Sequence, residues 1–225
     1  MNVFISKKVS KESHLKAFCL KNNYKLLDKS LIAFQAIEIH EPPPLTDVVF
    51  FSSPRSVQYF LKQQLYQVNQ LLAVMGQGTL NELNIYGHKA DFVGNGNPTE
   101  TSKRFKEWLQ EKTVLFPVSN RSNLSIQSAL NKSQYHNLPI YLTDLRPIKI
   151  NSEVLDILVF TSPSNVESYI KTNQILKKNV IISFGETTQK HINSLGYESI
   201  QLDEPTELGL VKTIEKVIFR NNELK

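Results

Sequence analysis

Six short loops carry the residues of this sequence that are best suited to chemistry. Each combines hydroxyl or amide side chains with glycine or proline, and each follows a predicted strand and precedes a predicted helix. The loops are residues 52–55, 76–79, 94–99, 119–122, 161–165 and 185–188. Because a helix N-terminus offers unpaired backbone N–H groups and the positive end of the helix dipole, it attracts anions. Several such loops around one cleft would suit a ligand that carries many carboxylates.

Each of these loops, taken singly, also has a structural explanation. The serines of Ser53-Pro54 and Ser162-Pro163 would cap free N–H groups of the following helix, and proline is favoured in the first helical turn. One loop of this kind therefore says little about function. In open parallel sheets, however, ligands bind beyond the carboxyl ends of the strands, so these loops are where we expect a site.

The usual catalytic and cofactor motifs do not occur in the sequence. Gly76-Gln77-Gly78 lacks the third glycine of a dinucleotide fingerprint, and neither a phosphate loop nor a serine-hydrolase elbow is found. Cys19, the only cysteine, lies in an apolar helical pattern that predicts a buried thiol. The five histidines have no His or Cys neighbour at metal-ligand spacing: His14, His40, His88, His136 and His191. We expect no metal site.

The composition indicates a protein with two small cores. The chain has 225 residues, 40% of them hydrophobic, and its net charge of +5 comes from basic residues interleaved with acidic ones. This pattern gives little support to nucleic-acid binding, although a basic-lined cleft could gather carboxylates. The sequence has no apolar run of about 20 residues, and its first residues lack the order of a signal peptide. We expect a cytoplasmic protein that binds neither nucleic acid nor membrane.

One stretch of the sequence occurs twice. Residues 48–57, VVFFSSPRSV, return as residues 157–166, ILVFTSPSNV, at an offset of 109 positions. The same offset carries Gly76 onto Gly185 and Thr79 onto Thr188. A repeat that keeps its register over this length predicts two domains of similar fold.

Short β-branched segments alternate with helical patterns in both halves of the chain. This alternation predicts an α/β fold with two similar doubly wound parallel-sheet domains. The predicted strands are residues 3–6, 48–52, 71–75, 114–116, 157–160 and 180–184. The predicted helices are residues 11–23, 56–65, 79–86, 124–130, 165–172 and 188–195.

Two extended segments, residues 32–37 and 140–148, are followed by or contain proline, at Pro42-Pro43-Pro44 and Pro147. Proline after a strand disfavours helix and suits a crossing between domains. If the chain crosses at both places, one domain is discontinuous and holds both termini. The spacing alone does not separate this arrangement from two tandem domains that divide near Glu111.

Several of these motifs together resemble the uroporphyrinogen-III synthase (HemD) family, over nearly the whole chain. The paired Ser-Pro loops, each followed by a strand and a Gly-x-x-Thr turn, match that family in order and spacing. Phe116-Pro117-Val118-Ser119-Asn120 resembles its central strand and loop, and Ile140-Tyr141-Leu142-Thr143 resembles its crossing strand. The resemblance implies two α/β domains joined by a two-stranded β-ladder, with domain 1 formed by residues 1–33 and 146–225, domain 2 by residues 38–140, and crossings at 32–37 and 140–148.

The resemblance also implies a function. The family closes hydroxymethylbilane, a linear tetrapyrrole with eight carboxylates, to uroporphyrinogen III with loss of water and inversion of ring D. This cyclising lyase reaction belongs to haem biosynthesis and needs no cofactor. A monomer is expected, with transient contact to hydroxymethylbilane synthase.

Carried over by motif position, Tyr141 becomes the candidate catalytic residue, which would assist departure of the hydroxyl group. The alternative interpretation of Tyr141 is a packing residue between domains. The resemblance implies substrate-binding roles for Ser53, Arg55, Gly76, Thr79, Ser162, Ser164, Gly185, Thr187 and Thr188. Arg121 and Arg146 are further candidates from their charge and position.

Two other functions remain open at this point. Two α/β lobes around a hinge are also typical of noncatalytic small-molecule-binding proteins. A degenerate homologue could likewise keep the fold without the activity. Turnover of the substrate separates both alternatives from a synthase.

Overall fold

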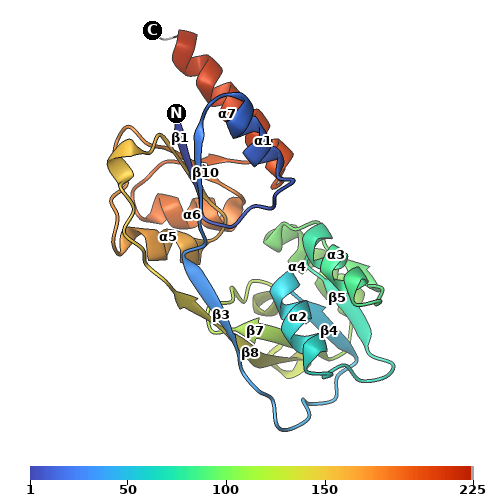
Figure 1. Ribbon diagram of the computed structural model, residues 1–225. Helices are drawn as coiled ribbons and strands as arrows, with labels where there is room; N and C mark the ends of the chain where they lie inside the picture. The colour runs from blue at the N-terminus through green and yellow to red at the C-terminus, as the bar shows by residue number, and fades with distance from the viewer. Residues whose placement is uncertain (224–225) are drawn as a thin grey trace. The chain divides into compact units, whose positions relative to one another are not determined.

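A computed structural model describes residues 1–223 of the chain, which form two compact units (Figure 1). Unit 1 contains residues 1–33 and the described residues from 144 onward, and unit 2 contains residues 34–143. The chain passes from unit 1 to unit 2 within β3 (Ile32–Ala36) and returns within β8 (Tyr135–Leu145). Within the described residues, none of the helices has both the length and the apolar character that a membrane crossing needs.

Unit 1 is built on a five-stranded parallel sheet with the strand order β11-β10-β9-β1-β2. Its strands are β1 (Asn2–Ile5), β2 (Lys25–Asp28), β9 (Ile157–Phe160), β10 (Val180–Ser183) and β11 (Ile200–Gln201). Its helices are α1 (His14–Lys21), α5 (Pro163–Ile170), α6 (Glu186–Ser194) and α7 (Glu207–Glu223), with a 3-10 turn at Ser152–Val154. The order β2-β1-β9-β10-β11 is that of a doubly wound fold, and its switch point lies between β1 and β9.

Alternate residues of each central strand in unit 1 face opposite layers of helices. Val3 and Ile5 pack with Leu15 of α1 and Leu210 of α7 on one face. Phe4 packs on the other face with α5 and α6. Because both faces are covered, all four residues of β9 are buried, and the strand reads as one continuous apolar run.

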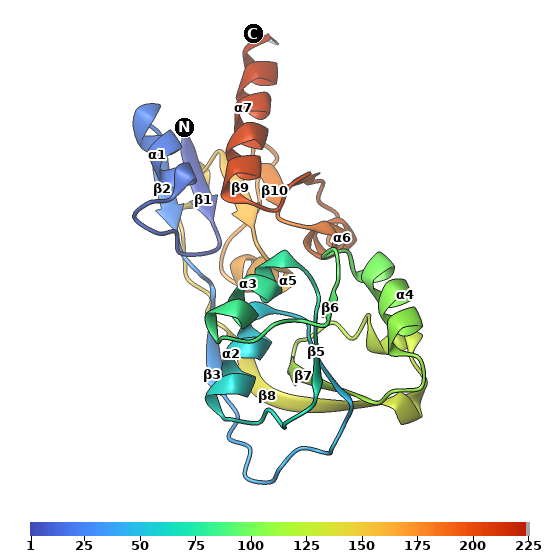
Figure 2. The same cartoon turned by 90° about the vertical axis from the view of Figure 1, so that its right-hand side faces the viewer.

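Unit 2 is built on a six-stranded sheet with the order β3-β8-β7-β4-β5-β6, in which β4 to β8 run parallel. Besides β3 and β8, its strands are β4 (Val48–Phe51), β5 (Leu71–Val74), β6 (Phe92–Val93) and β7 (Val114–Ser119). The helices are α2 (Pro54–Lys62), α3 (Gln77–Ile85) and α4 (Pro98–Leu109), with 3-10 turns at Gln127–Ala129 and Lys132–Gln134. Figure 2 shows α4 on one side of this sheet and α2 with α3 on the other.

The two sheets have the same arrangement, but the chain enters them at different strands. The offset of 109 residues carries β4 and β5 onto β9 and β10, including the pairing of Val48 with Leu71 onto that of Ile157 with Val180. The third strands, β6 and β11, also correspond, but with a shift of one residue from this offset. The neighbours β7 and β8 in unit 2 take the places of β1 and β2 in unit 1. The predicted pair of similar doubly wound parallel sheets is confirmed, and the two chains of strands are related by circular permutation.

One local prediction is wrong, and another is confirmed only in part. Residues 124–130 do not form a helix, because only Gln127–Ala129 makes a short 3-10 turn before the chain enters β8. The loop at 119–122 therefore ends a strand without opening an α-helix. The segment predicted as extended over 140–148 is strand as far as Leu145. The strand begins earlier than predicted, at Tyr135, because Tyr135 to Pro139 pair with Val114 to Val118 of β7.

An aspartate just before the central strand of each unit accepts a hydrogen bond from a backbone N–H at the start of the neighbouring strand. In unit 2, Asp47 Oδ2 accepts hydrogen bonds of 2.8 Å from both the N–H and the hydroxyl of Thr113. In unit 1, Asp156, the repeat partner of Asp47, accepts a 2.7 Å hydrogen bond from the N–H of Asn2. The bonds from Thr113 hold the pKa of Asp47 below its ordinary value.

The lowered pKa predicts that Asp47 stabilises unit 2 in a pH-dependent way. Its carboxylate contributes stability above the unfolded-state pKa of about 3.9, and that contribution disappears as the pH falls through the lower pKa of the folded state. In urea unfolding, Asp47→Asn should lower the midpoint at pH 7 and differ less from the unmodified protein at pH 3. Asp203→Asn, at a residue whose side chain is 91% exposed, is the matched control and should leave both midpoints unchanged. An Asp47→Asn effect of equal size at both pH values would contradict this role.

Candidate functional site

In unit 2, the loop after β4 brings Ser53 and Tyr141 together. Ser53 caps α2: its hydroxyl accepts a 3.2 Å hydrogen bond from the N–H of Ser56, and its own N–H donates to the Ser56 hydroxyl. Tyr141 comes from β8, 88 residues further along the chain, and its hydroxyl oxygen lies 3.4 Å from the Ser53 hydroxyl oxygen. Two residues that the sequence singled out separately are therefore neighbours at one sheet edge.

The ring of Tyr141 is held by aromatic neighbours. It stacks on Tyr59 of α2, with ring centroids 5.1 Å apart and planes inclined by 15°. On another side its centroid lies 6.1 Å from that of Phe34 in β3. Only 6% of Tyr141 is exposed, so packing fixes the ring while the hydroxyl faces the loop.

Arg55 lies at the outer side of the same aromatic group. Its guanidinium carbon is 4.3 Å from the centroid of Phe34, and its Nη1 donates a 2.9 Å hydrogen bond to Gln58. A guanidinium over a ring face is attracted by the ring electrons and keeps its remaining N–H groups available. Sequence reasoning named Arg55 but missed Phe34 and Tyr59, since no motif marks a residue whose role is to contact another segment's ring.

The glycine loop after β5 is tightly packed. A Cβ at Gly76 would lie 3.0 Å from backbone atoms of Gly96, and a Cβ at Gly94 would lie 2.4 Å from the carbonyl oxygen of Met75. The glycines thus allow two neighbouring loops to approach closely. Thr79, whose N–H donates to the Gly76 carbonyl, is only 4% exposed.

In unit 1, the loop after β9 is tied to the end of β1. Ser162 caps α5 and accepts hydrogen bonds from both the N–H and the side-chain amide of Asn165. The N–H of the preceding Thr161 donates a 2.9 Å hydrogen bond to the Ser6 hydroxyl. Ser164 follows in the first turn of α5 and is half-buried. The sequence did not single out Ser6, whose role depends on the parallel pairing of β1 with β9.

The loop after β10 repeats the Gly-x-x-Thr turn with more space around its glycine. Gly185 caps α6, and no atom lies within 4 Å of the position that a Cβ would take there. The N–H of Thr188 donates to the Gly185 carbonyl, as Thr79 does to Gly76 in unit 2. Thr187 is half-buried and Thr188 is 4% exposed. Between these two residues, Thr187 presents more of its surface to solvent.

The two additional arginines lie in different settings. The Arg146 guanidinium is 63% exposed and lies 3.6 Å from a carboxylate oxygen of Asp144. Arg121 is exposed, and its N–H donates to the Ser119 hydroxyl. In the described part of the chain, no three His, Cys, Asp or Glu side chains gather closely enough to hold a metal ion.

Chemically, each unit provides hydroxyls and helix N-termini at the carboxyl end of its own sheet, and unit 2 adds Arg55. Such groups bind and orient an anion. The Tyr141 hydroxyl is the group among them that combines a buried ring with a proton to donate. The arrangement therefore suits positioning of a polycarboxylate more than acid–base chemistry by carboxyl or imidazole groups.

Comparisons with known proteins converge on one family. The family model described as uroporphyrinogen-III synthase HemD matches residues 28–212. Among solved structures, uroporphyrinogen-III synthetase from Helicobacter pylori is similar with a TM-score of 0.69 and 16% identity, covering 96% of this chain and 99% of that one. A mutant uroporphyrinogen III synthase from Thermus thermophilus gives a TM-score of 0.69 and 15% identity, covering 98% and 99% of the two chains. No curated protein sequence matches this chain significantly.

Proposed function

The chain belongs to the uroporphyrinogen-III synthase HemD family, and from this premise we propose how its residues carry out the family's reaction. The protein is a cyclising lyase of haem biosynthesis. It converts hydroxymethylbilane to uroporphyrinogen III, with loss of water and inversion of ring D.

The observation that carries this function is the family match over residues 28–212. That span contains both Ser-Pro loops, both Gly-x-x-Thr turns and Tyr141. The two solved synthase structures share the fold over almost their full length, which agrees with the family match. We found no observation that favours a noncatalytic binding protein or a degenerate homologue.

The reaction depends on holding a flexible chain in one shape. The substituted carbon of ring D must meet the cation that forms on ring A when the hydroxyl group leaves, so that a spirocyclic intermediate forms and ring D is inverted. Fixing two reacting groups in contact removes much of the entropic barrier to such a step. A site made mainly of hydroxyls and backbone N–H groups is suited to this task.

In this proposal, Tyr141 donates a proton to the departing hydroxyl group, which leaves as water. Three contacts support this role: the ring packs between Tyr59 and Phe34, and the hydroxyl lies beside Ser53. The packed ring leaves the hydroxyl as the polar end of an otherwise apolar side chain. The remaining candidate residues, in their two units, would bind carboxylates of the bilane: Ser53, Arg55, Gly76, Thr79, Ser162, Ser164, Gly185, Thr187 and Thr188.

The packing of the glycine loops refines the proposed binding roles. Gly185 has open space beside it and suits direct approach of a carboxylate to the α6 N-terminus. The space beside Gly76 is occupied by the backbone of Gly96, so a carboxylate would not approach Gly76 from that side. Gly76 would instead assist binding by fixing the position of the α3 N-terminus. The family match also implies hydroxymethylbilane as the substrate. A cytoplasmic location, a monomeric state and transient contact with hydroxymethylbilane synthase are further proposals that need their own measurements.

The isomer of the porphyrin product tests the function directly. The protein is mixed with freshly generated hydroxymethylbilane, the product is oxidised, and the porphyrin isomers are separated. We expect type III, because the unaided bilane closes without inverting ring D and gives type I. Type I alone from a folded sample would contradict the synthase and favour a binding protein or a degenerate homologue.

Replacing Tyr141 by Phe tests the proposed proton donor. The substitution keeps the ring that stacks on Tyr59 but removes the hydroxyl beside Ser53, so kcat should fall by roughly 100-fold with little change in KM. Tyr24→Phe removes a hydroxyl from a ring that packs on Phe18 in unit 1 and should keep the kcat of the unmodified enzyme. An unchanged kcat for Tyr141→Phe would leave Tyr141 as a packing residue.

A further inference from the structure

Lys7 lies at the switch point of the unit 1 sheet, just after β1. The neighbouring strand on one side is β9, which begins the other branch of the doubly wound fold. Ligands of such sheets bind in the crevice at this point, beyond the carboxyl ends of the strands. The position of Lys7 in the fold therefore makes it a candidate for ligand contact, although no motif identified it.

The backbone at Lys7 is fixed by its neighbour Ser6. The Ser6 N–H donates a 2.9 Å hydrogen bond to the carbonyl of Val159, and its hydroxyl accepts one from the N–H of Thr161. These bonds anchor the start of the Lys7 loop beside the loop that contains Ser162. Lys7 is thus adjacent to one of the two proposed binding loops of unit 1.

The side chain of Lys7 reaches the other proposed loop. Its ammonium nitrogen lies 4.9 Å from the ring centroid of Phe184, the residue that precedes Gly185. A cation in this position is attracted by the ring and is held without using its N–H donors. Lys7 therefore reaches from the end of β1 to the end of β10, on the face of the sheet that α1 and α7 cover.

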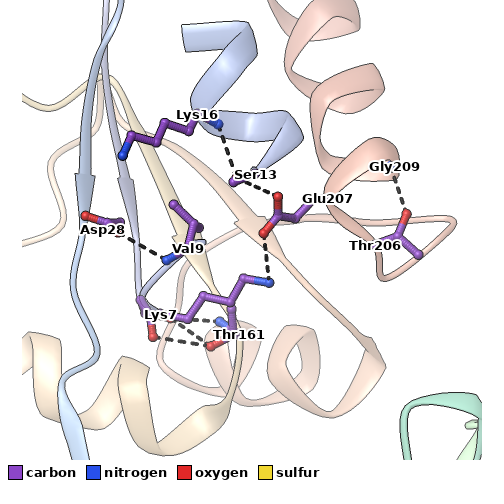
Figure 3. Close-up of polar contacts among 10 residues, drawn as sticks. Lys7, Val9, Ser13, Lys16, Asp28, Thr161, Thr206, Glu207 and Gly209 are labelled. Atoms are coloured by element: carbon purple, nitrogen blue, oxygen red, sulfur yellow. Dashed lines mark hydrogen bonds and ion pairs between the residues drawn. The ribbon is translucent and has the colours of Figure 1, made fainter. Parts of the chain in front are cut away.

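One carboxylate of the protein faces this ammonium group. Glu207, the first residue of α7, places Oε1 at 3.6 Å from the Lys7 nitrogen, longer than an ordinary hydrogen bond (Figure 3). Its other oxygen accepts a 2.6 Å hydrogen bond from the Ser13 hydroxyl. The contact therefore fixes a negative charge near Lys7 but leaves the ammonium donors uncommitted.

The charge of Glu207 persists at neutral pH. Burial by itself would raise the pKa of this carboxyl, but the hydrogen bond from Ser13, the nearby charge of Lys7 and the N–H of Leu15 outweigh burial and lower it. An incoming carboxylate would therefore meet attraction from Lys7 and repulsion from Glu207. The two charges act on it with opposite sign.

We propose that Lys7 binds a carboxylate of the tetrapyrrole substrate at the switch point of unit 1, and that Glu207 weakens this binding by partly neutralising Lys7. This inference rests on the proposed function, from which it takes the polycarboxylate ligand. It adds a binding residue from β1 to those of the Ser-Pro and Gly-x-x-Thr loops. It also assigns an opposing role to an acidic residue at the start of α7.

Lys8 provides a matched control in the same loop. Its ammonium nitrogen lies 3.4 Å from Asp28, at the end of the edge strand β2, and its side chain is 75% exposed compared with 36% for Lys7. Lys8 thus has the same charge and a similar acidic partner, but it lies on the side of β1 away from β9 and β10. A general effect of positive charge in this loop would appear in both lysines.

Calorimetric titration with uroporphyrin III, the stable oxidised form of the product, tests the inference on the full chain. Losing one partly exposed ionic hydrogen bond should raise the Kd of Lys7→Met about five- to tenfold. Lys7→Arg should keep the Kd within about twofold, and Lys8→Met should leave it unchanged. Glu207→Gln, which keeps an acceptor for Ser13 but removes the charge, should lower the Kd about two- to fivefold.

Three results would overturn the inference: an unchanged Kd for Lys7→Met, an equal increase for Lys8→Met, or weaker binding by Glu207→Gln. Unfolding midpoints measured in parallel identify variants that fail to fold, in which case Lys7→Arg and Glu207→Gln carry the test. Because this readout needs no turnover, it is independent of the isomer assay. Type III product with an unchanged Lys7→Met Kd rejects only the inference, whereas type I product with weakened binding rejects only the synthase.

Discussion

The constraint on which the rest of the structure depends is the pairing of one buried central strand in each unit, β4 in unit 2 and β9 in unit 1, with parallel neighbours of its own sheet. Every residue of both strands is buried, and each strand is hydrogen-bonded to parallel neighbours on both sides. Parallel neighbours end at the same edge and need helical crossovers to return. Both strands must therefore end in a turn that opens a helix, and the capped Ser53-Pro54 and Ser162-Pro163 turns meet that need. The same turns place hydroxyls and helix N-termini where a carboxylate can bind.

The circular permutation explains how two similar units acquire different sites. The repeat supplies matching loops after β4 and β9 and after β5 and β10, but the third loop comes from β7 in unit 2 and from β1 in unit 1. Lys7 follows β1, which lies outside the two segments that the 109-residue repeat relates. The equivalent glycines also differ, since Gly76 packs against Gly96 and Gly185 is open. The units thus share a scaffold while offering a ligand different groups.

Much of the fold could be predicted from the sequence because its signals are local. The continuous apolar runs at 48–51 and 157–160 and the 109-residue offset predict the sheets, and the pairing of Val48 with Leu71 recurs at Ile157 and Val180. The predictions that failed concern segments whose structure depends on distant partners, such as 124–130 and the start of β8. The contacts of Phe34, Tyr59 and Ser6 could not be predicted for the same reason, because each contact joins elements that are far apart in the sequence.

We expect the carboxylates of the tetrapyrrole to bind at the carboxyl ends of both sheets. Titrating the isotope-labelled protein with uroporphyrin III and following backbone amide resonances tests it most directly. The largest shifts should fall on residues 53–56, 76–79, 162–165 and 185–188. Shifts concentrated instead at the amino ends of the strands would contradict this expectation. Two surface cavities lie there, one lined by residues 45–47 with 68–70 and the other by residues 149–153 with 172–174 and 176.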